Sequence, residues 1–201
     1  MLFESMHVRL GRVNHAAGFR PAAADPAGVR SMNVDLGLLV LRVVVGAVVA
    51  THGLLKLGWV GKGGSIAAVA GWFGSIGLRP GLFWALVSVS AEAGGGLLTI
   101  LGLGGPIGPG VLAADMAVVT VVAHWPKGFW SHEGGIEFPL PLAAGAFAVA
   151  LIGNGSWSVD GALGLVYPAW LGGVWAILMI LGAAAALLGR MVLAPRAARA
   201  A

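Results

Sequence analysis

The stretch LGLLVLRVVVGAVVATHGLLKL, residues 36–57, decides the fold. About 20 apolar residues, each rising about 1.5 Å, match the ~30 Å hydrocarbon core of a bilayer, so the stretch predicts a transmembrane helix. It also carries Arg42, His52 and Lys56, which fall along one side of that helix at 100° per residue. A charge near the bilayer centre costs at least ~2.5–3.5 kcal/mol. This polar stripe is therefore expected to face other helices, with acidic partners at matching depth.

The composition of the whole chain places it in the membrane class. Of 201 residues, 58% are hydrophobic and only 10% are charged, and the mean hydropathy is +0.91. A soluble domain has about 25% charged residues. The chain has no cysteine, which excludes disulfides, thiol redox chemistry and cysteine-ligated clusters. Basic residues gather near the two termini, where they are typical of membrane flanks, and no nucleic-acid module is present.

Further apolar stretches predict a compact bundle of four to five transmembrane helices. They cover residues 81–103, a span that begins at 107 or 111 and ends at 125, a short span at 137–152, and residues 167–188. Helical spacing of apolar residues within 58–80 predicts a short interfacial helix between the first two spans. No alternating strand pattern is present, which favours an all-α integral membrane protein over a barrel. Residues 1–33 and 191–201 are expected to be basic tails, the first of them flexible.

Three charged residues lie near the centres of three successive predicted spans. They are Arg42, Glu92 and Asp115. Their charges are complementary, and the guanidinium fork of arginine can engage two acceptors. We therefore expect an intramembrane charge cluster at one depth. Such a cluster is a functional candidate by default, although a buried ion pair can equally serve only to hold helices in register.

A second group of polar residues is expected at the membrane face where the first span ends. It comprises His52, Lys56, His124, Trp125 and Glu137. Imidazoles, an ammonium group, a carboxylate and an indole around a crevice suit a quinone, whose carbonyl oxygens need donors and whose ring packs on aromatic side chains. His124 beside Trp125 can also simply cap a helix at the interface. No local ligand spacing such as HxxxH occurs, so no metal site is predicted.

The order of several short motifs resembles the DoxX family of bacterial membrane proteins. They are R-x9-H-G-L-x-K at 42–56, Gly77-Leu78-x-Pro80, Ala91-Glu92-x-Gly94-Gly95, His124-Trp125-Pro126-x-Gly128-Phe129 and Glu137-x-Pro139-Leu140. The resemblance covers about residues 35–160 and ends at the Trp157–Asp160 stretch. It implies a four-helix bundle over 34–163 in the cytoplasmic membrane, so the helix at 164–190 is an addition to the family pattern.

The resemblance also implies a function. Its relatives are linked to quinone reduction, or to a membrane complex of redox-protective enzymes with a superoxide dismutase and a sulfurtransferase. We therefore expect a redox-associated subunit that binds a quinone, with partner proteins and further copies of itself as candidate contacts. No haem, flavin or iron–sulfur motif is visible, and without cysteine the chain cannot accept sulfane sulfur. The alternatives are a non-catalytic scaffold for oxidative-stress enzymes and, third, a small-solute or proton carrier.

Overall fold

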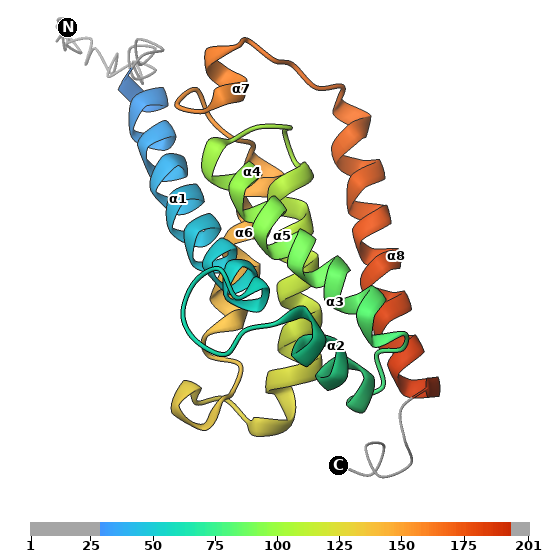
Figure 1. Cartoon of the computed structure of the whole chain (residues 1–201). Coiled ribbons are helices and arrows are strands. Elements are labelled where there is room, and N and C mark those ends of the chain that lie inside the picture. Colours follow the sequence, from blue (N-terminus) through green and yellow to red (C-terminus); the bar gives the residue numbers. More distant parts are fainter. Residues whose placement is uncertain (1–28, 194–201) are drawn as a thin grey trace, which may run out of the picture.

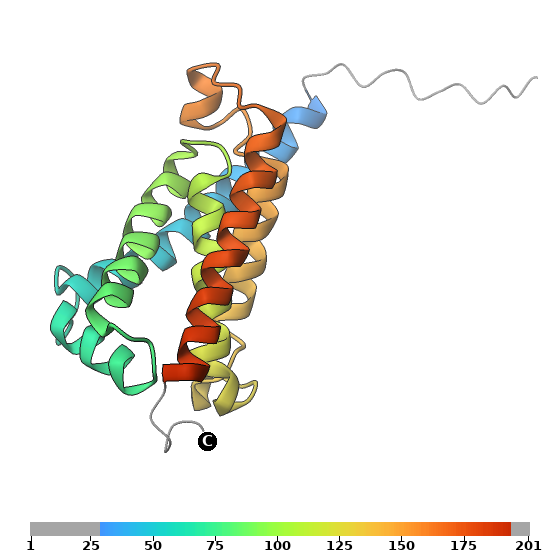
Figure 2. The ribbon, with the colours of Figure 1, turned by 90° about the vertical axis from the view of Figure 1, so that its right-hand side faces the viewer.

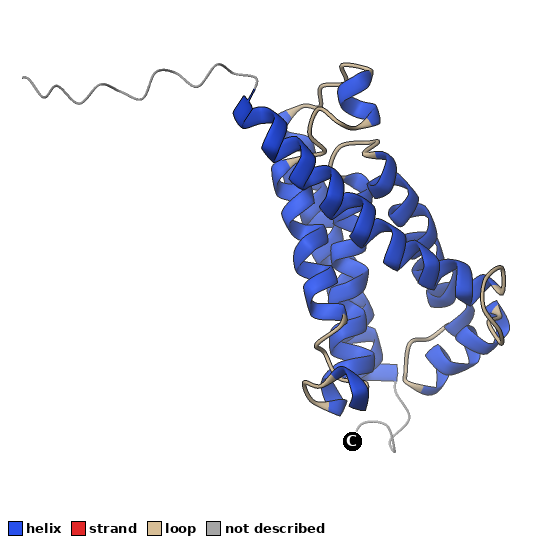
Figure 3. Cartoon of the chain, turned by 90° about the vertical axis from the view of Figure 1, so that its left-hand side faces the viewer, coloured by secondary structure: helices blue, strands red, loops and turns tan. Residues whose placement is uncertain are grey.

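The computed structural model describes residues 29–193, and this part of the chain is helical with no strand (Figures 1 and 3). The longer helices are α1 (Val29–Leu57), α2 (Ile66–Ser75), α3 (Gly81–Val89), α4 (Gly96–Leu101), α5 (Ile107–Val119), α6 (Pro139–Ile152) and α8 (Ala169–Leu193). Two π-helical segments, η1 (Ser90–Gly95) and η2 (Thr120–His124), continue α3 and α5. The short segments are η3 (Trp125–Lys127), η4 (Ser131–Glu133) and α7 (Val159–Ala162).

In the part of the chain that the structure describes, four helices are long and apolar enough to cross a membrane. They cover Met32–Leu57, Gly81–Leu101, Ile107–Lys127 and Ala169–Leu193. The predicted all-α membrane bundle is thus confirmed. The fourth predicted span is α6, whose 14 residues extend about 21 Å and fall short of a ~30 Å hydrocarbon core.

Glycine allows the first two spans to pack closely. A Cβ atom added to Gly46 of α1 would lie 2.8 Å from the carbonyl oxygen of Gly96 in α4, and one added to Gly96 would lie 2.7 Å from Cβ of Ala50. Membrane helices associate through such close backbone contacts, because lipid gives no hydrophobic force between them. This contact fixes the register between α1 and the second span, and so sets which residues of the two helices share a depth.

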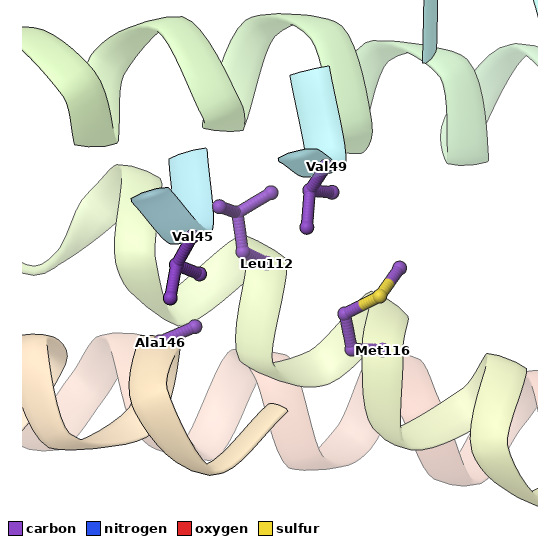
Figure 4. Packing of buried hydrophobic residues seen from close by; sticks show 5 residues of the cluster. All are labelled: Val45, Val49, Leu112, Met116 and Ala146. Carbon is purple, nitrogen blue, oxygen red and sulfur yellow. The ribbon is translucent and has the colours of Figure 1, made fainter. Parts of the chain in front are cut away.

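The main apolar core lies where α1, α5 and α6 meet. Figure 4 shows its five buried side chains, which are Val45, Val49, Leu112, Met116 and Ala146. The neighbouring side of α1 carries Arg42, Gly46, Gly53 and Lys56, which turn toward α3, η1 and α4. Arg42 and Lys56 of the polar stripe therefore face protein, as their charge requires, whereas His52 is exposed.

The predicted short helix between the first two spans is α2. It begins after Ser65, whose side-chain oxygen accepts a hydrogen bond from the Ala68 amide, and this N-cap satisfies one of the free donors of the first turn. Phe73 of α2 is buried in a second apolar cluster with Leu78, Ala85, Val122 and Ala186. That cluster joins the lower end of α8 in Figure 1 to the second and third spans.

The ends of the chain only partly fall within the described residues. α1 begins at Val29, before the predicted tail ends at residue 33, and the expectation of a flexible tail otherwise concerns residues 1–28, outside the described part. The added helix predicted at 164–190 is α8, which continues to Leu193. The remainder of the predicted C-terminal tail, residues 194–201, also lies outside the described part.

Candidate functional site

A cavity of about 1130 Å³ separates the second span and α2 from α5, η2 and α8. In Figure 2, α2 and α3 lie on the left, apart from α5 and α8. Most of the lining is apolar, including Trp72, Phe73, Trp84 and Val118. The polar and titratable side chains in the lining are those of His52, Lys56, Ser88, Ser90, Glu92, Asp115 and His124. A mostly apolar hollow with a few convergent polar groups is the usual form of a small-molecule site.

An ion pair defines the polar end of the cavity. The ammonium nitrogen of Lys56 lies 2.7 Å from Oε2 of Glu92 and donates a hydrogen bond of 2.9 Å to the Ser88 hydroxyl. Glu92 is only 3% exposed and the Lys56 side chain is 21% exposed. The buried carboxylate is therefore partnered by a cation that is only partly exposed, as a charge within a membrane protein requires. Sequence reasoning missed Ser88, because a serine in an apolar span is usually bonded to its own helix.

Asp115 on α5 faces this pair from the third span. It interacts electrostatically with Glu92 and Lys56 and with the Ser88 hydroxyl. Its Oδ2 atom is buried, and within residues 29–193 it has no hydrogen-bond partner. The cluster thus holds two carboxyl groups and one ammonium group, so its acceptors outnumber its donors. It has a free position at which a ligand or a proton can bind.

Two segments that contribute polar residues to the cavity wall are π-helical. Glu92 lies inside η1, and His124 is the last residue of η2. A π-helical turn inserts one residue into an α-helix and turns the side chains that follow, and such segments are frequent at functional sites. Neither segment carries a signal that sequence reasoning could use, because helical periodicity over one extra residue is too weak to detect.

The predicted crevice is only partly assembled. His52, Lys56 and His124 line the cavity, and His124 is fixed by a 2.6 Å hydrogen bond between Nδ1 and the Gly134 carbonyl. Trp125 and Glu137 do not line it: Trp125 is 65% exposed, and Glu137 accepts a hydrogen bond from the Ser131 amide. The Ser131 hydrogen bonds lower the pKa of Glu137. Glu137 therefore caps the loop that includes η4 and does not contribute to the cavity.

The expected convergence of Arg42 with Glu92 and Asp115 was wrong. Arg42 is fully buried, but its guanidinium donates hydrogen bonds to the backbone carbonyls of Ile100 and Trp157. The physical reason is register: the contact of Gly46 with Gly96 and Ile100 places Arg42 beside the end of α4. Lys56 lies 14 residues further along α1, about 21 Å, and it is the cation that meets Glu92.

A second buried acid, Asp160, lies near Arg42 and interacts with its charge. Asp160 in α7 accepts hydrogen bonds from the amides of Gly104 and Gly105, from the Asn154 side chain and from the Tyr167 hydroxyl, over 2.7–3.0 Å. Burial alone would raise the pKa of Asp160, but these hydrogen bonds outweigh it, so the pKa is lowered. We call Arg42, Asn154, Asp160 and Tyr167 the end lock, because they tie α1 and α7 to the turn between α4 and α5.

Tyr167 gives the end lock a direct spectroscopic signal. Its hydrogen bond to Asp160 raises the pKa of the phenol above its ordinary value of 10.0, and it is the only tyrosine in the chain. A titration of phenolate absorbance should therefore have a midpoint above 10, and Asp160→Asn should bring the midpoint back toward 10. The hydrogen bond is correspondingly present below pH 10 and lost as the pH rises through the raised pKa. An unchanged midpoint in Asp160→Asn would contradict the assignment.

Within residues 29–193, no group of three or more histidine or acidic side chains is arranged to hold a metal ion.

The helical bundle, with its polar residues turned inward, defines a multi-pass membrane protein. The model of the DoxX family matches residues 37–125, and this match supports membership of the DoxX family, as the motifs indicated. No curated protein and no solved structure matches the chain significantly. The matched segment contributes Lys56, Ser88, Glu92 and Asp115 to the cavity, whereas α8 lies beyond it.

Proposed function

We propose that the protein binds a quinone, or a similar lipid-soluble molecule, in this cavity, and that it acts as a redox-associated subunit of the bacterial cytoplasmic membrane. The observation that carries the proposal is the cavity itself. Its volume of about 1130 Å³ exceeds the ~300–1,000 Å³ usual for small-molecule sites. Its apolar walls end in a buried cluster of donors and acceptors, which matches an apolar molecule with a polar head.

Each part of a quinone has a complementary group in the cavity. The ammonium of Lys56 and the imidazoles of His52 and His124 can donate hydrogen bonds to carbonyl oxygens. Trp72 and Trp84 offer aromatic surface to the ring. The carboxyl groups near Lys56 can exchange a proton with the bound head group, which quinone reduction and quinol oxidation both require. The electrons would come from a partner protein, because no haem, flavin or iron–sulfur motif is visible in the sequence.

Filling the cavity tests this proposal without changing any charge. Ala114 and Ala117 lie one turn apart on α5, but only Ala114 lines the cavity, and Ala117 is exposed. The full-length protein in lipid nanodiscs is titrated with a menaquinone analogue, and binding is followed by quenching of tryptophan fluorescence. We expect saturable binding that Ala114→Phe weakens at least tenfold, about 1.4 kcal/mol. Ala117→Phe is the matched control and should bind as the unmodified protein does.

Two results would refute the proposal. The first is the absence of saturable binding to the unmodified protein. The second is an equal response of the two phenylalanine variants, which would mean that the analogue partitions into lipid or binds elsewhere. Thermal unfolding of both variants distinguishes a filled cavity from a damaged fold.

The other functions implied by the family resemblance remain predictions. A scaffold for oxidative-stress enzymes would use the exposed aromatic residues of the loop, which include Trp125, Phe129 and Trp130. The same residues are typical of a membrane interface, so they do not favour a protein partner. A solute or proton carrier is expected to have paired discontinuous helices at the centre of the membrane, and no such pair was predicted from the sequence. Contacts with redox partners and with further copies of the chain are likewise proposals.

A further inference from the structure

The cavity has a polar end and an exposed apolar rim. At the polar end, Glu92 and Ser88 are 3% and 5% exposed, whereas the lining residues His52 and Ser90 are exposed. At the other end, the lining residues Phe83, Leu86 and Val87 of α3 are 54%, 51% and 41% exposed. Gly182 and Ala185 of α8 also line the cavity and are exposed. The rim is formed by α8 and by α3, the first part of the span Gly81–Leu101, and both spans are long and apolar enough to cross a membrane.

α8 is held at its two ends, and the rim lies between these attachments. Near its beginning, Trp175 Nε1 donates a 3.1 Å hydrogen bond to the carbonyl of Ile107. Near its end, Arg190 Nε donates a 3.1 Å hydrogen bond to the carbonyl of Ile76. Between these points the face of α8 toward the cavity carries small side chains, including Gly182, Ala183 and Ala186. Figure 2 shows the lower half of α8 beside α5, with α3 set apart from it.

Gly182 lies at the rim, and the backbone there does not require a glycine. It lies within α8, and a Cβ atom built on it meets no other atom within 4 Å. Close helix packing therefore does not require glycine there, in contrast to Gly46 and Gly96. A larger side chain at position 182 would fill the space between α3 and α8.

We propose that the ligand enters from the bilayer through this opening between α3 and α8, and that its apolar tail lies across Gly182 when its polar head reaches Lys56 and Asp115. The identity of the tail rests on the proposed function, whereas the opening toward lipid does not. The opening explains how a cavity with an apolar rim and a buried polar end is filled, since such a ligand is dissolved in the membrane. The wall that completes it, α8, lies outside the segment that the family model matches.

The absence of native cysteine allows a direct test. Ala114→Cys places one thiol in the cavity of the full-length protein, which is reconstituted in lipid vesicles. The thiol is treated either with an alkyl methanethiosulfonate that dissolves in lipid or with a permanently charged one that stays in water, and modification is followed by mass spectrometry. We expect the alkyl reagent to react at least tenfold faster. Adding Gly182→Leu should slow that reaction at least tenfold.

The matched control is Gly173→Leu. Gly173 also lies in α8, is exposed, and has no atom within 4 Å of a built Cβ, but it does not line the cavity. This control should leave the reaction rate unchanged. Equal rates in the two leucine variants, or faster reaction with the charged reagent, would overturn the proposal. Both leucines replace a helical glycine with a better helix former, so neither is expected to harm the fold.

A second measurement separates the tail from the opening. We expect a quinone with an isoprenoid tail to bind Gly182→Leu at least tenfold more weakly than the unmodified protein, whereas a tailless naphthoquinone loses much less affinity. Equal losses for both molecules would refute the position of the tail. If neither quinone binds the unmodified protein, the proposed function and the tail assignment fail together, while the thiol reaction still decides the opening toward lipid.

Discussion

Asp160→Ala is expected to lower the free energy of unfolding by at least about 3 kcal/mol. The carboxylate accepts hydrogen bonds from four donors and is only 6% exposed. Its removal leaves those donors without their acceptor, at a cost of about 1–3 kcal/mol for each one that stays buried. Chemical denaturation of the purified protein in detergent, followed by circular dichroism, measures the loss.

Asp35→Ala provides the comparison. Asp35 also accepts hydrogen bonds, from the amide and hydroxyl of Ser156, but these lie at an exposed position. Its substitution should have a much smaller effect. If the two variants lose similar stability, the end lock does not anchor α7 to the turn between α4 and α5 as described.

Arg42→Met and Lys56→Met both remove a cation from the same face of α1, but they are expected to affect different properties. The first should lower stability and the second should lower quinone affinity. Arg42→Met should destabilise the protein by about 2–4 kcal/mol, because the carbonyls of Ile100 and Trp157 lose their donor. It should leave quinone affinity unchanged in the molecules that remain folded. Lys56→Met should lower quinone affinity at least tenfold, because it removes the donor at the polar end of the cavity.

The two methionine variants are compared by denaturation and by the fluorescence titration. Methionine preserves the apolar stem of either side chain, so the difference between the variants reports on the lost cation. A loss of quinone affinity in Arg42→Met would instead support the cluster of Arg42, Glu92 and Asp115 that the sequence predicted. Unchanged affinity in Lys56→Met would place the head group away from the ion pair.

The sequence by itself determined the class of protein and the inward direction of the charged residues Arg42 and Lys56. Long apolar stretches form helices in lipid because every backbone polar group there needs an internal partner. A charged residue within such a stretch must face protein because lipid cannot solvate it. These two rules predicted the helical bundle and the burial of Arg42 and Glu92, and the helical spacing of apolar residues predicted the short helix α2.

Only the tertiary structure decided which charges meet. Distance from the centre of each span predicts that Arg42 lies opposite Glu92. The close contact between Gly46 and Gly96 instead fixes a register in which Lys56 is the partner. The π-helical turns around Glu92 and His124 shift side chains by amounts that periodicity does not reveal. The distant α8 completes the cavity. Register, helix irregularity and long-range packing depend on atomic contacts between segments, and residue types along one segment do not specify those contacts.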